Sequence, residues 1–377
     1  MEPKEIIQTI RTIHEMEEGF IPLHEPRFWG KEKAYLNATI DSTFVSSVGQ
    51  YVDQVEEMLA KMTQTRKCAA VVNGTSALQV ALRVAGVNVG EEVLTQALTF
   101  VATANAIAYN GAHPVFLDVD IDTMGLSATA LETWLIANAE KRETGAFNKQ
   151  TNRRIAACLP MHTFGFMCRM DKIMEVCDAW NIPVVEDAAE ALGSQYRGQC
   201  AGSWGMMGAF SFNGNKIITS GGGGAVVSSD PQWAERVKYL TTTAKKPHTY
   251  EYIHEEMGYN FRMPNLNAAL LVAQLEQLDT FITSKKNLFE AYRTKLDSVV
   301  DIPEGTEWNH WLISLELENK EERDAVLAAT NEEGVMTRPI WQLMYRLPMY
   351  GHCQRDDQKN AEFLEERIIN IPSSARR

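Results

Sequence analysis

Lys216 is the residue whose setting most suggests chemistry. The alternating residues 208–212 predict a buried strand, and a loop then carries Lys216 beyond its end. A lysine fixed beside apolar and small residues can have a depressed pKa, because desolvation disfavours the charged ammonium. Such an amine can form a Schiff base with a carbonyl compound. Taken alone, Lys216 fits a solvated loop lysine better, since lysine side chains are mostly exposed.

Four consecutive glycines, Gly221 to Gly224, follow this lysine closely. Glycine loses more backbone entropy on ordering than any other residue, so four of them make a poor strand or helix interior. They predict either a close approach of the backbone to a ligand or an unusual turn.

Asp187 offers a second reactive group. The β-branched run 182–185 predicts a strand buried on both faces, and Glu186 and Asp187 follow at its carboxyl end. Open α/β sheets bind ligands outside the carboxyl ends of their strands. An aspartate there is well placed to hold a protonated pyridine nitrogen, the partner that pyridoxal 5'-phosphate (PLP) requires. Asp187 could equally cap a helix over 188–191.

A third segment has the features of an anion site. Gly74, Thr75 and Ser76 lie between the strand-like residues 68–72 and the helix-like residues 77–82. A glycine turn and hydroxyl side chains at the start of a helix present N–H groups and the positive end of the helix dipole. The segment could bind a cofactor phosphate, although Thr75 or Ser76 would also serve as a simple N-cap.

Together these segments resemble a known family. Residues 74–78, 186–194 and 210–216, with the glycine run, are similar to the PLP-dependent nucleotide-sugar aminotransferases of the DegT/DnrJ/EryC1/StrS family. The resemblance extends from about residue 21 to the C-terminus and implies the fold type I (aspartate aminotransferase-like) architecture. Residues 20–26 and 40–49 look most like the branch that aminates 4-keto-6-deoxy-N-acetylhexosamine nucleotides on routes to legionaminic acid or bacillosamine.

The resemblance also implies roles for individual residues. Lys216 would be the catalytic residue, which holds PLP and moves a proton as general base and acid. Asp187 would keep the ring nitrogen protonated, and Phe100 would stack on the pyridine ring, with an apolar core position as the alternative for Phe100. The full set of implied cofactor-binding residues is Gly74, Thr75, Ser76, Phe100, Asp187, Glu190, Ser211, Lys216 and Asn260.

Asn260 has a separate implication. Residues 258–262 resemble the family's Gly-Tyr-Asn-Tyr-Arg segment, whose asparagine reaches the cofactor phosphate of the other subunit. If Asn260 does the same, each site needs two chains. The resemblance therefore implies a homodimer with shared active sites.

Three further residues are candidates near the site. His162 follows the strand-like residues 155–159 and could contact the cofactor or the sugar, or could only satisfy backbone groups. Glu190 stands where many family members carry glutamine or histidine near the ring oxygen of the cofactor. An anionic glutamate would repel a phenolate, so a direct contact requires a proton or a bridging water. Tyr345 lies in the irregular residues 341–357, whose family counterpart borders the nucleotide or sugar.

The order of elements predicts an α/β fold. Strand and helix patterns alternate from residue 68 to about 229, which is typical of a mainly parallel sheet with helices on both faces. From about residue 305 the patterns favour a small α+β lobe. We therefore expect an N-terminal segment and large PLP-binding domain over 1–257, and linking helices with a small C-terminal domain over 258–377. Exposed irregular segments are expected at 140–153 and 241–257.

Composition limits the class of protein. The chain has 377 residues and a net charge of −13, which argues against a nucleic-acid partner and requires local positive potential for an anionic substrate. Its six cysteines lack the spacing of a disulfide framework or a metal site and fit a reducing compartment. The N-terminus lacks signal-peptide features, and no apolar run is long enough to span a membrane, so we expect a cytoplasmic protein.

The predicted reaction is transfer of an amino group from L-glutamate to the C4 keto group of a nucleotide-linked sugar. A histidine in place of the lysine marks the sugar dehydratases of the family, so Lys216 favours transamination. Amination of a 3-keto sugar and a non-catalytic role as a sensor or regulator on the same fold are the alternatives. A dehydrogenase is disfavoured, because the glycines at 202–208 precede a strand instead of opening a helix after one.

Overall fold

The structure is a computed structural model that describes residues 2–377. Its centre is a sheet with strand order β3-β2-β6-β7-β10-β11-β1, in which parallel bridges from Cys158 to Val184 and from Met161 to Asp187 join the two halves. Only β11 runs against the others, because it pairs antiparallel with both β10 and β1. The strands are β1 (Lys67–Val71), β2 (Glu92–Gln96), β3 (His113–Leu117), β6 (Ile155–Leu159), β7 (Val185–Asp187), β10 (Met207–Ser211) and β11 (Gly224–Ser228). The expected mainly parallel sheet is confirmed.

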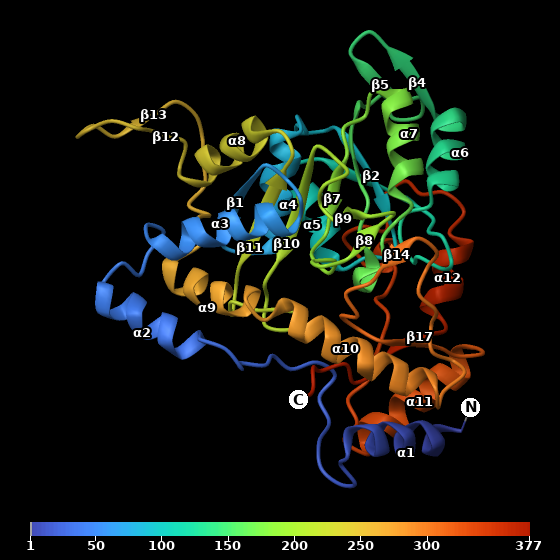
Figure 1. The fold of residues 1–377 in the computed structure, drawn as a ribbon. Coiled ribbons are helices and arrows are strands. Elements are labelled where there is room, and N and C mark those ends of the chain that lie inside the picture. Colours follow the sequence, from blue (N-terminus) through green and yellow to red (C-terminus); the bar gives the residue numbers. More distant parts are fainter. Residues whose placement is uncertain (1) are drawn as a thin grey trace.

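Helices cover both faces of this sheet (Figure 1). One apolar cluster includes α4 (Gly74–Val84), α5 (Val101–Tyr109) and α8 (Pro231–Thr241), and the other includes α3 (Gln50–Met62), α6 (Ala128–Asn138) and α7 (Met170–Trp180). Because successive side chains of a strand point to opposite faces of the sheet, the residues of one strand are divided between these two clusters. In β1, Ala69 and Val71 face the α4 side, whereas Cys68 and Ala70 face the α3 side.

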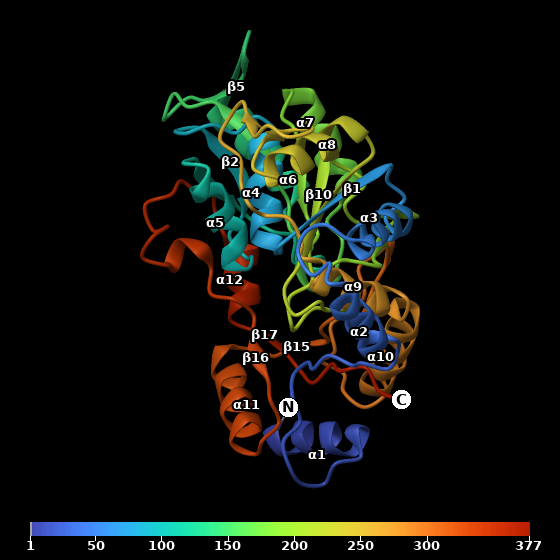
Figure 2. The same ribbon diagram turned by 90° about the vertical axis from the view of Figure 1, so that its left-hand side faces the viewer.

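The N-terminal and C-terminal segments build the rest of the molecule together. The small sheet has the order β15-β17-β16, and α1 packs against α10 and α11 (Figure 2). A bridge from Ile21 to Val335 continues this association. The linking helices that were expected after residue 258 are α9 and α10. The elements are α1 (Pro3–His14), α2 (Glu32–Ser42), α9 (Asn265–Leu275), α10 (Leu278–Arg293), β15 (Ser314–Glu316), α11 (Lys320–Glu332), β16 (Arg338–Pro339), α12 (Lys359–Glu365) and β17 (Ile368–Asn370).

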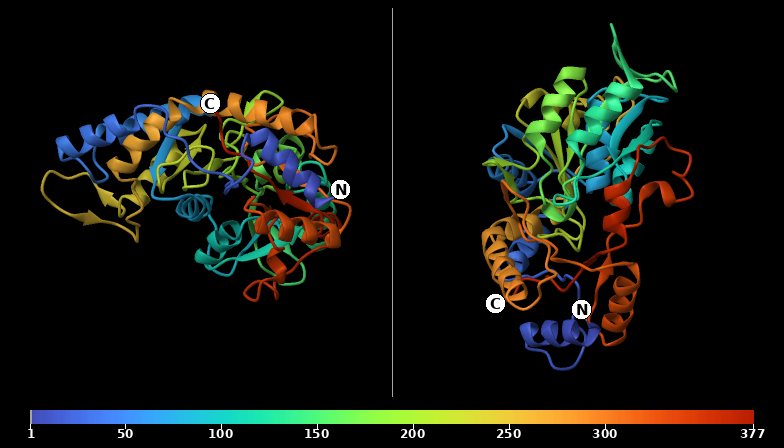
Figure 3. Two further views of the ribbon diagram at one scale, coloured as in Figure 1. Left: turned by 90° about the horizontal axis from the view of Figure 1, so that it is seen from below. Right: turned by 90° about the vertical axis from the view of Figure 1, so that its right-hand side faces the viewer.

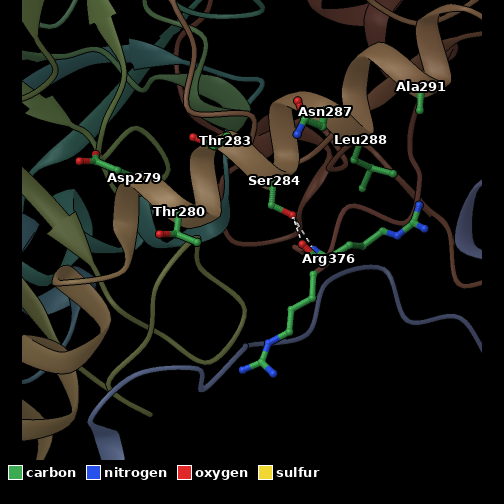
Figure 4. Close-up of a pocket in the computed structure, with 9 residues that line it drawn as sticks. Asp279, Thr280, Thr283, Ser284, Asn287, Leu288, Ala291 and Arg376 are labelled. Atoms are coloured by element: carbon green, nitrogen blue, oxygen red, sulfur yellow. Dashed lines mark hydrogen bonds between the residues drawn. The ribbon is translucent and has the colours of Figure 1, made fainter.

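The end of the chain is docked along α10. Ser284 Oγ donates to the Arg376 carbonyl and accepts from the Arg376 amide, both at 2.6 Å, beside an open cavity of about 600 Å³ (Figure 4). The Tyr292 hydroxyl donates to the Pro372 carbonyl at 3.0 Å. The C-terminal residues are therefore part of the packed structure.

Two of the expected irregular segments contain hairpins. Within 140–153 lies most of the hairpin β4 (Ala139–Arg142) and β5 (Gly145–Asn148), and within 241–257 lies the shorter hairpin β12 (Lys245–Lys246) and β13 (Ile253–His254). The second hairpin projects from the body of the molecule (Figure 3, left). The remaining short elements are β8 (Gln195–Tyr196), β9 (Gln199–Cys200), β14 (Thr306–Glu307), η1 (Thr163–Gly165) and η2 (Met344–Arg346).

Over residues 2–377 no helix combines the length and apolar character needed to cross a membrane. The six cysteines are buried and free.

Candidate active site

A cavity of about 650 Å³ lies at the carboxyl ends of β7 and β10, between the main sheet and the small sheet. Seven of the residues that sequence reasoning selected line it, and they come from four separate segments. These residues are Gly74, Thr75, Phe100, Asp187, Glu190, Ser211 and Lys216. The predicted strand-end positions therefore converge on one place.

Lys216 is presented by the turn that follows β10. Its amide donates to the Asn213 carbonyl at 3.0 Å, which closes the turn, and its side chain is only 12% exposed. The Nζ atom lies 3.0 Å from Glu190 Oε1 and 4.4 Å from the centre of the Trp311 ring. The amine is thus held between a carboxylate and an aromatic face.

Glu190 is fixed from both sides. Its second oxygen, Oε2, accepts from the Phe164 amide at 3.0 Å, and the side chain is 2% exposed. Burial raises the pKa of Glu190, although the neighbouring Lys216 ammonium opposes that shift. The direct contact of this carboxylate is with Lys216.

Asp187 points its carboxylate toward the cavity from the end of β7. Oδ2 accepts from Thr103 Oγ1 at 2.7 Å, and Oδ1 accepts from the Ala189 amide at 3.2 Å. Burial raises the pKa of Asp187, and these two hydrogen bonds act in the opposite direction. Residues 188–191 form turns and no helix, so Asp187 is not a helix cap.

Thr99 and Thr103 support Asp187, and sequence reasoning missed both. Their hydroxyl oxygens lie 2.7 Å apart, which makes a chain from Thr99 through Thr103 to the carboxylate. Both threonines are fully buried. The available signal was two hydroxyl residues four positions apart around the start of α5: Thr103 lies in the first turn of the helix, and Thr99 directly precedes its N-cap residue, Phe100.

The start of α4 has the geometry of an anion site. The N-cap is Asn73, whose Oδ1 accepts from the Ser76 amide at 2.8 Å. A Cβ atom on Gly74 would lie 2.7 Å from Ser211 Cβ, so only glycine allows the helix start to approach the end of β10 this closely. Thr75 lines the cavity, whereas Ser76 is not among the lining residues and its amide is already bonded.

The glycine run serves packing around this helix start. Gly221 has a φ of +75°, which L side chains rarely adopt, and a Cβ atom on Gly224 would lie 2.4 Å from the backbone carbon of Asn73. None of the four glycines is among the residues that line the cavity. The run therefore provides an unusual turn and a close approach of two backbone segments.

Aromatic side chains form one wall of the cavity. Phe100 is 49% exposed, so it is not a core residue, and its ring centre lies 6.3 Å from that of Trp341 in an edge-on arrangement. Phe164 lies 5.0 Å from Trp341 and 6.4 Å from Trp311. Trp341 belongs to residues 341–357, which were expected to border the nucleotide or sugar, whereas Trp311 and the nearby Arg338 were not anticipated, because they come from a lobe distant in sequence.

His162 does not reach the cavity. It is fully buried, its Nδ1 accepts from the Cys168 amide at 3.2 Å, and its Nε2 lies 3.1 Å from Glu186 Oε2. The Glu186 carboxylate also accepts backbone N–H groups of the loop that precedes β10, from Gly202, Trp204 and Gly205. The structure thus places His162 in a buried pair that holds this loop, and not beside a cofactor or sugar.

Asn260 and Tyr345 also lie outside the cavity lining. Asn260 is exposed and forms an antiparallel bridge with Thr242, so its role in the site of a partner subunit stays a prediction. The Tyr345 hydroxyl donates to Glu362 Oε1 at 2.7 Å, and burial raises the pKa of Tyr345 to about 12. A contact of Tyr345 with substrate likewise stays a prediction.

Comparison with known proteins points in the same direction. A model of the DegT/DnrJ/EryC1/StrS aminotransferase family matches residues 28–376. EpsN of Bacillus subtilis (strain 168), provisionally described as a pyridoxal phosphate-dependent aminotransferase, is 36% identical over 364 residues, which cover 94% of this chain and 91% of EpsN. GDP-perosamine synthase of Escherichia coli O157:H7 is 35% identical over 357 residues, with 94% and 93% covered.

A solved structure adds the fold. PseC of Helicobacter pylori, an aminotransferase involved in the biosynthesis of pseudoaminic acid, aligns with a TM-score of 0.85 at 21% identity and covers 94% of both chains. The main sheet and the small C-terminal lobe described above thus form a known architecture.

Proposed function

This chain belongs to the DegT/DnrJ/EryC1/StrS aminotransferase family, whose members depend on PLP, and from that premise we propose that it transfers an amino group from L-glutamate to a keto group of a nucleotide-linked sugar. The observation that carries the proposal is the convergence of Lys216, Asp187 and the start of α4 on one cavity. A lysine amine, a buried carboxylate and an anion site are the three groups that PLP requires.

The residues present fit PLP. Lys216 would hold it through Nζ, Asp187 would face the ring nitrogen, and the phosphate would lie against Gly74, Thr75 and Ser211. The Cβ-free approach of Gly74 to Ser211 keeps this corner open to backbone N–H groups. When bound, PLP supplies an electron sink for negative charge on the carbon that carries the amino group.

The chain's own groups then orient the reaction and move the proton. When it is not bound to the cofactor, Lys216 Nζ would act as general base and then as general acid: it would take the proton from the carbon that carries the amino group and deliver it to the cofactor carbon that takes the amino group over. Glu190, 3.0 Å away, balances the charge of the ammonium form. Asp187 balances a positive ring nitrogen, and the Thr103 hydroxyl keeps its carboxylate aimed at the cavity. The aromatic wall limits access of water to these groups.

For the acceptor we propose the C4 keto group of a nucleotide-linked 4-keto-6-deoxy-(N-acetyl)hexosamine, for surface glycans of the legionaminic acid or bacillosamine type. Support comes from residues 20–26 and 40–49, which resemble that branch, and from the similarity to a GDP-perosamine synthase. A 3-keto sugar is the alternative, since the same groups would serve it. A purely regulatory role is disfavoured, because Lys216, Asp187 and the α4 anion site are all present in one cavity.

An absorption experiment tests the proposal. Purified protein with PLP should show a band near roughly 410–430 nm from the cofactor attached to lysine, and glutamate should shift it to shorter wavelength. A panel of UDP- and GDP-linked 4-keto and 3-keto sugars is then added, and recovery of the band identifies the acceptor. A Lys216→Ala variant should lose turnover. If that variant turns over normally, or if glutamate leaves the wild-type band unchanged, the proposal is wrong.

A further inference from the structure

Four charged side chains line the cavity, and one of them has no role in the chemistry described so far. They are Asp187, Glu190, Lys216 and Arg338. Lys216 pairs with Glu190, and Asp187 bonds to Thr103 and Ala189. Arg338, on β16 of the small sheet, makes no ion pair with any carboxylate in residues 2–377; its contacts are with neutral oxygens. It is therefore the unpaired cation of the cavity.

Arg338 is anchored in a way that leaves part of its guanidinium available. Nη1 donates to Asn331 Oδ1 at 2.9 Å and to the Thr337 carbonyl at 2.8 Å. Asn331 is itself fixed on α11, because its amide nitrogen donates to the Leu327 carbonyl at 2.8 Å. These contacts occupy one of the three guanidinium nitrogens. A planar cation fixed at one nitrogen is suited to donate its remaining N–H groups to a phosphate or carboxylate.

The position of Arg338 in the cavity indicates which anion of the substrates it contacts. Asp187 is buried and Lys216 is only 12% exposed, whereas Arg338 is exposed, so Arg338 is the lining residue of the three that lies nearest to solvent and to the mouth of the cavity. The carboxylate beside the amino group of glutamate is one bond from the reacting carbon, so it must lie at the floor near Lys216. In a nucleotide sugar that reacts at C3 or C4, the diphosphate is joined to C1, and part of the sugar ring separates it from the reacting carbon. The diphosphate therefore lies toward the mouth.

The net charge of the chain adds weight to a local cation. With a net charge of −13, the protein as a whole disfavours the approach of an anion, so a cation that lines the cavity favours binding of a nucleoside diphosphate there. We propose that Arg338 binds the diphosphate of the nucleotide-sugar substrate and so selects a nucleotide-linked sugar over a free one. This inference rests on the proposed function, because it deepens the identity of the acceptor.

Equilibrium binding tests this role without any transfer of an amino group. Calorimetric titration of the PLP-loaded wild type with GDP and UDP, and with guanosine and uridine, separates the diphosphate from the nucleoside. Arg338→Gln should weaken binding of the preferred diphosphate by about 10- to 100-fold, as loss of a charged hydrogen bond implies, and leave nucleoside binding unchanged. Arg338→Lys should fall between the two, because it keeps the charge and loses the planar fork.

Arg293→Gln is the matched control. Arg293 is an exposed arginine at the end of α10 that pairs with Asp301 at 2.8 Å and does not line the cavity. The Arg293→Gln variant should bind the diphosphate as tightly as the wild type does. All variants should unfold near the melting temperature of the wild type. Equal diphosphate binding by the wild type and Arg338→Gln, or none by the wild type, would overturn the inference.

Kinetics distinguish the two substrates. In Arg338→Gln the KM for the sugar nucleotide should rise. The concentration of glutamate that produces the spectral change should stay the same as for the wild type. A rise confined to glutamate would instead assign Arg338 to the amino donor and refute the diphosphate role. Because the GDP and UDP titrations need no reaction, they decide about Arg338 even if the proposed transamination is wrong.

Discussion

The hydrogen-bonded chain from Thr99 through Thr103 to Asp187 sets the properties of the most important carboxylate in the site. Burial raises the pKa of Asp187, and the Thr103 hydroxyl opposes that shift by donating to Oδ2 at 2.7 Å. A carboxylate that must stay ionised in a buried place depends on such donors. The threonines are thus positioning residues for the carboxylate.

A Thr103→Val substitution tests this dependence. Loss of the donor should raise the pKa of Asp187, since a hydrogen bond to a charged group contributes about 1.5–3 kcal/mol, or about one to two pH units. The acidic limb of the pH profile of kcat/KM should therefore move to higher pH. Thr103→Ser, which keeps the hydroxyl, should retain the wild-type limb. Superimposable profiles for valine and wild type would show that Thr103 does not control Asp187.

Sequence reasoning located some single residues and not others for a geometric reason. Lys216 and Asp187 were found because carboxyl ends of parallel strands share one edge. For His162 the sequence left open a contact with the cofactor or sugar and a purely structural role, and the structure shows the structural contacts. Met161 is the residue paired with Asp187 across the parallel bridge, so Met161 faces the cavity and His162 faces the opposite side with Glu186. A one-residue uncertainty in register reverses the face, and composition does not resolve it.

At the scale of elements, the site depends on how closely α4 approaches the ends of β10 and β11. Gly74 lies against Ser211 and Gly224 lies against Asn73, in both cases closer than any Cβ atom would permit. The helix start, and with it the anion site, is therefore fixed by two glycines that contribute no side-chain chemistry.

Gly224→Ala tests this arrangement. The new methyl group would meet the Asn73 backbone at 2.4 Å, and backbone cannot move aside as a flexible side chain can. We expect a loss of about 1–3 kcal/mol in the free energy of unfolding, as for other overpacked sites, together with weaker PLP binding. Thermal unfolding and PLP titration measure the two effects.

The neighbouring Gly222→Ala is the control. A Cβ atom there would meet only the Val72 carbonyl oxygen at 3.9 Å, and Gly222 has no positive φ. This variant should resemble the wild type in both stability and PLP affinity. Equal losses in the two variants would mean that the close approach of Gly224 to the Asn73 backbone does not set stability or PLP affinity, because Gly→Ala at an unstrained position should not destabilise the protein.

Elements were predicted well where their own pattern decides them. The strand-like residues 155–159 and the alternating residues 208–212 correspond to β6 and β10, because their pattern is visible locally. The turns over 188–191 were read as a possible helix, because short alanine-rich runs favour a helix and only tertiary packing overrides that preference. The hairpin within 140–153 was hidden by its polar, charged composition.

For the whole molecule, the junction of the two lobes contains an unusual buried cation. Lys285 on α10 is 1% exposed, and its Nζ donates to the carbonyls of Trp311, at 2.9 Å, and Ser373. Burial lowers the pKa of Lys285 to about 7, and the nearby Arg27 adds to that effect. The same residue therefore links the C-terminal residues to the loop that places Trp311 beside Lys216.

This burial predicts a specific pH dependence of stability. Between pH 7 and about 10.5 the unfolded chain keeps the Lys285 proton and the folded chain loses it, so the unfolded state binds more protons. The contribution of Lys285 to the free energy of unfolding should then rise with pH in that window, with a slope approaching about 1.4 kcal/mol per pH unit. The slope should be absent below pH 7, where both states are protonated.

Denaturant unfolding of the wild type and Lys285→Met from pH 6 to 10 measures this contribution. The difference between the two curves is the relevant quantity, because other groups titrate equally in both proteins. Parallel curves would show that Lys285 keeps its ordinary pKa in the folded state.

The dimer with shared sites is a prediction for the assembly. Asn260 is exposed, as a residue that serves a partner's site must be before association. If it does so, Lys216→Ala and Asn260→Ala should each be inactive or weak alone, and refolding them together should restore up to about a quarter of the wild-type sites, since half of random dimers are mixed and each has one intact site. No recovery in verified mixed dimers would place both residues in the same subunit's site.

Only part of the overall architecture could be predicted from the sequence. The α/β class and the small C-terminal lobe follow from the order of the patterns. The packing of residues 371–376 along α10 and the entry of Trp311 and Arg338 into the cavity depend on contacts between segments far apart in the chain, which local patterns do not contain. The boundary between 1–257 and 258–377 stays a prediction.

The docking of α1 has a consequence for the synthesis of the protein on the ribosome. Ile6 and Ile10 are fully buried, and α1 packs only once α10 and α11 exist, with the bridge from Ile21 to Val335 beside it. Val335 follows His14 by 321 residues, so even at about 20 residues per second the ribosome needs about 16 s to supply this surface. Throughout that interval the nascent chain carries an apolar helix face with no partner, and chaperones that bind such segments during translation have that long to act.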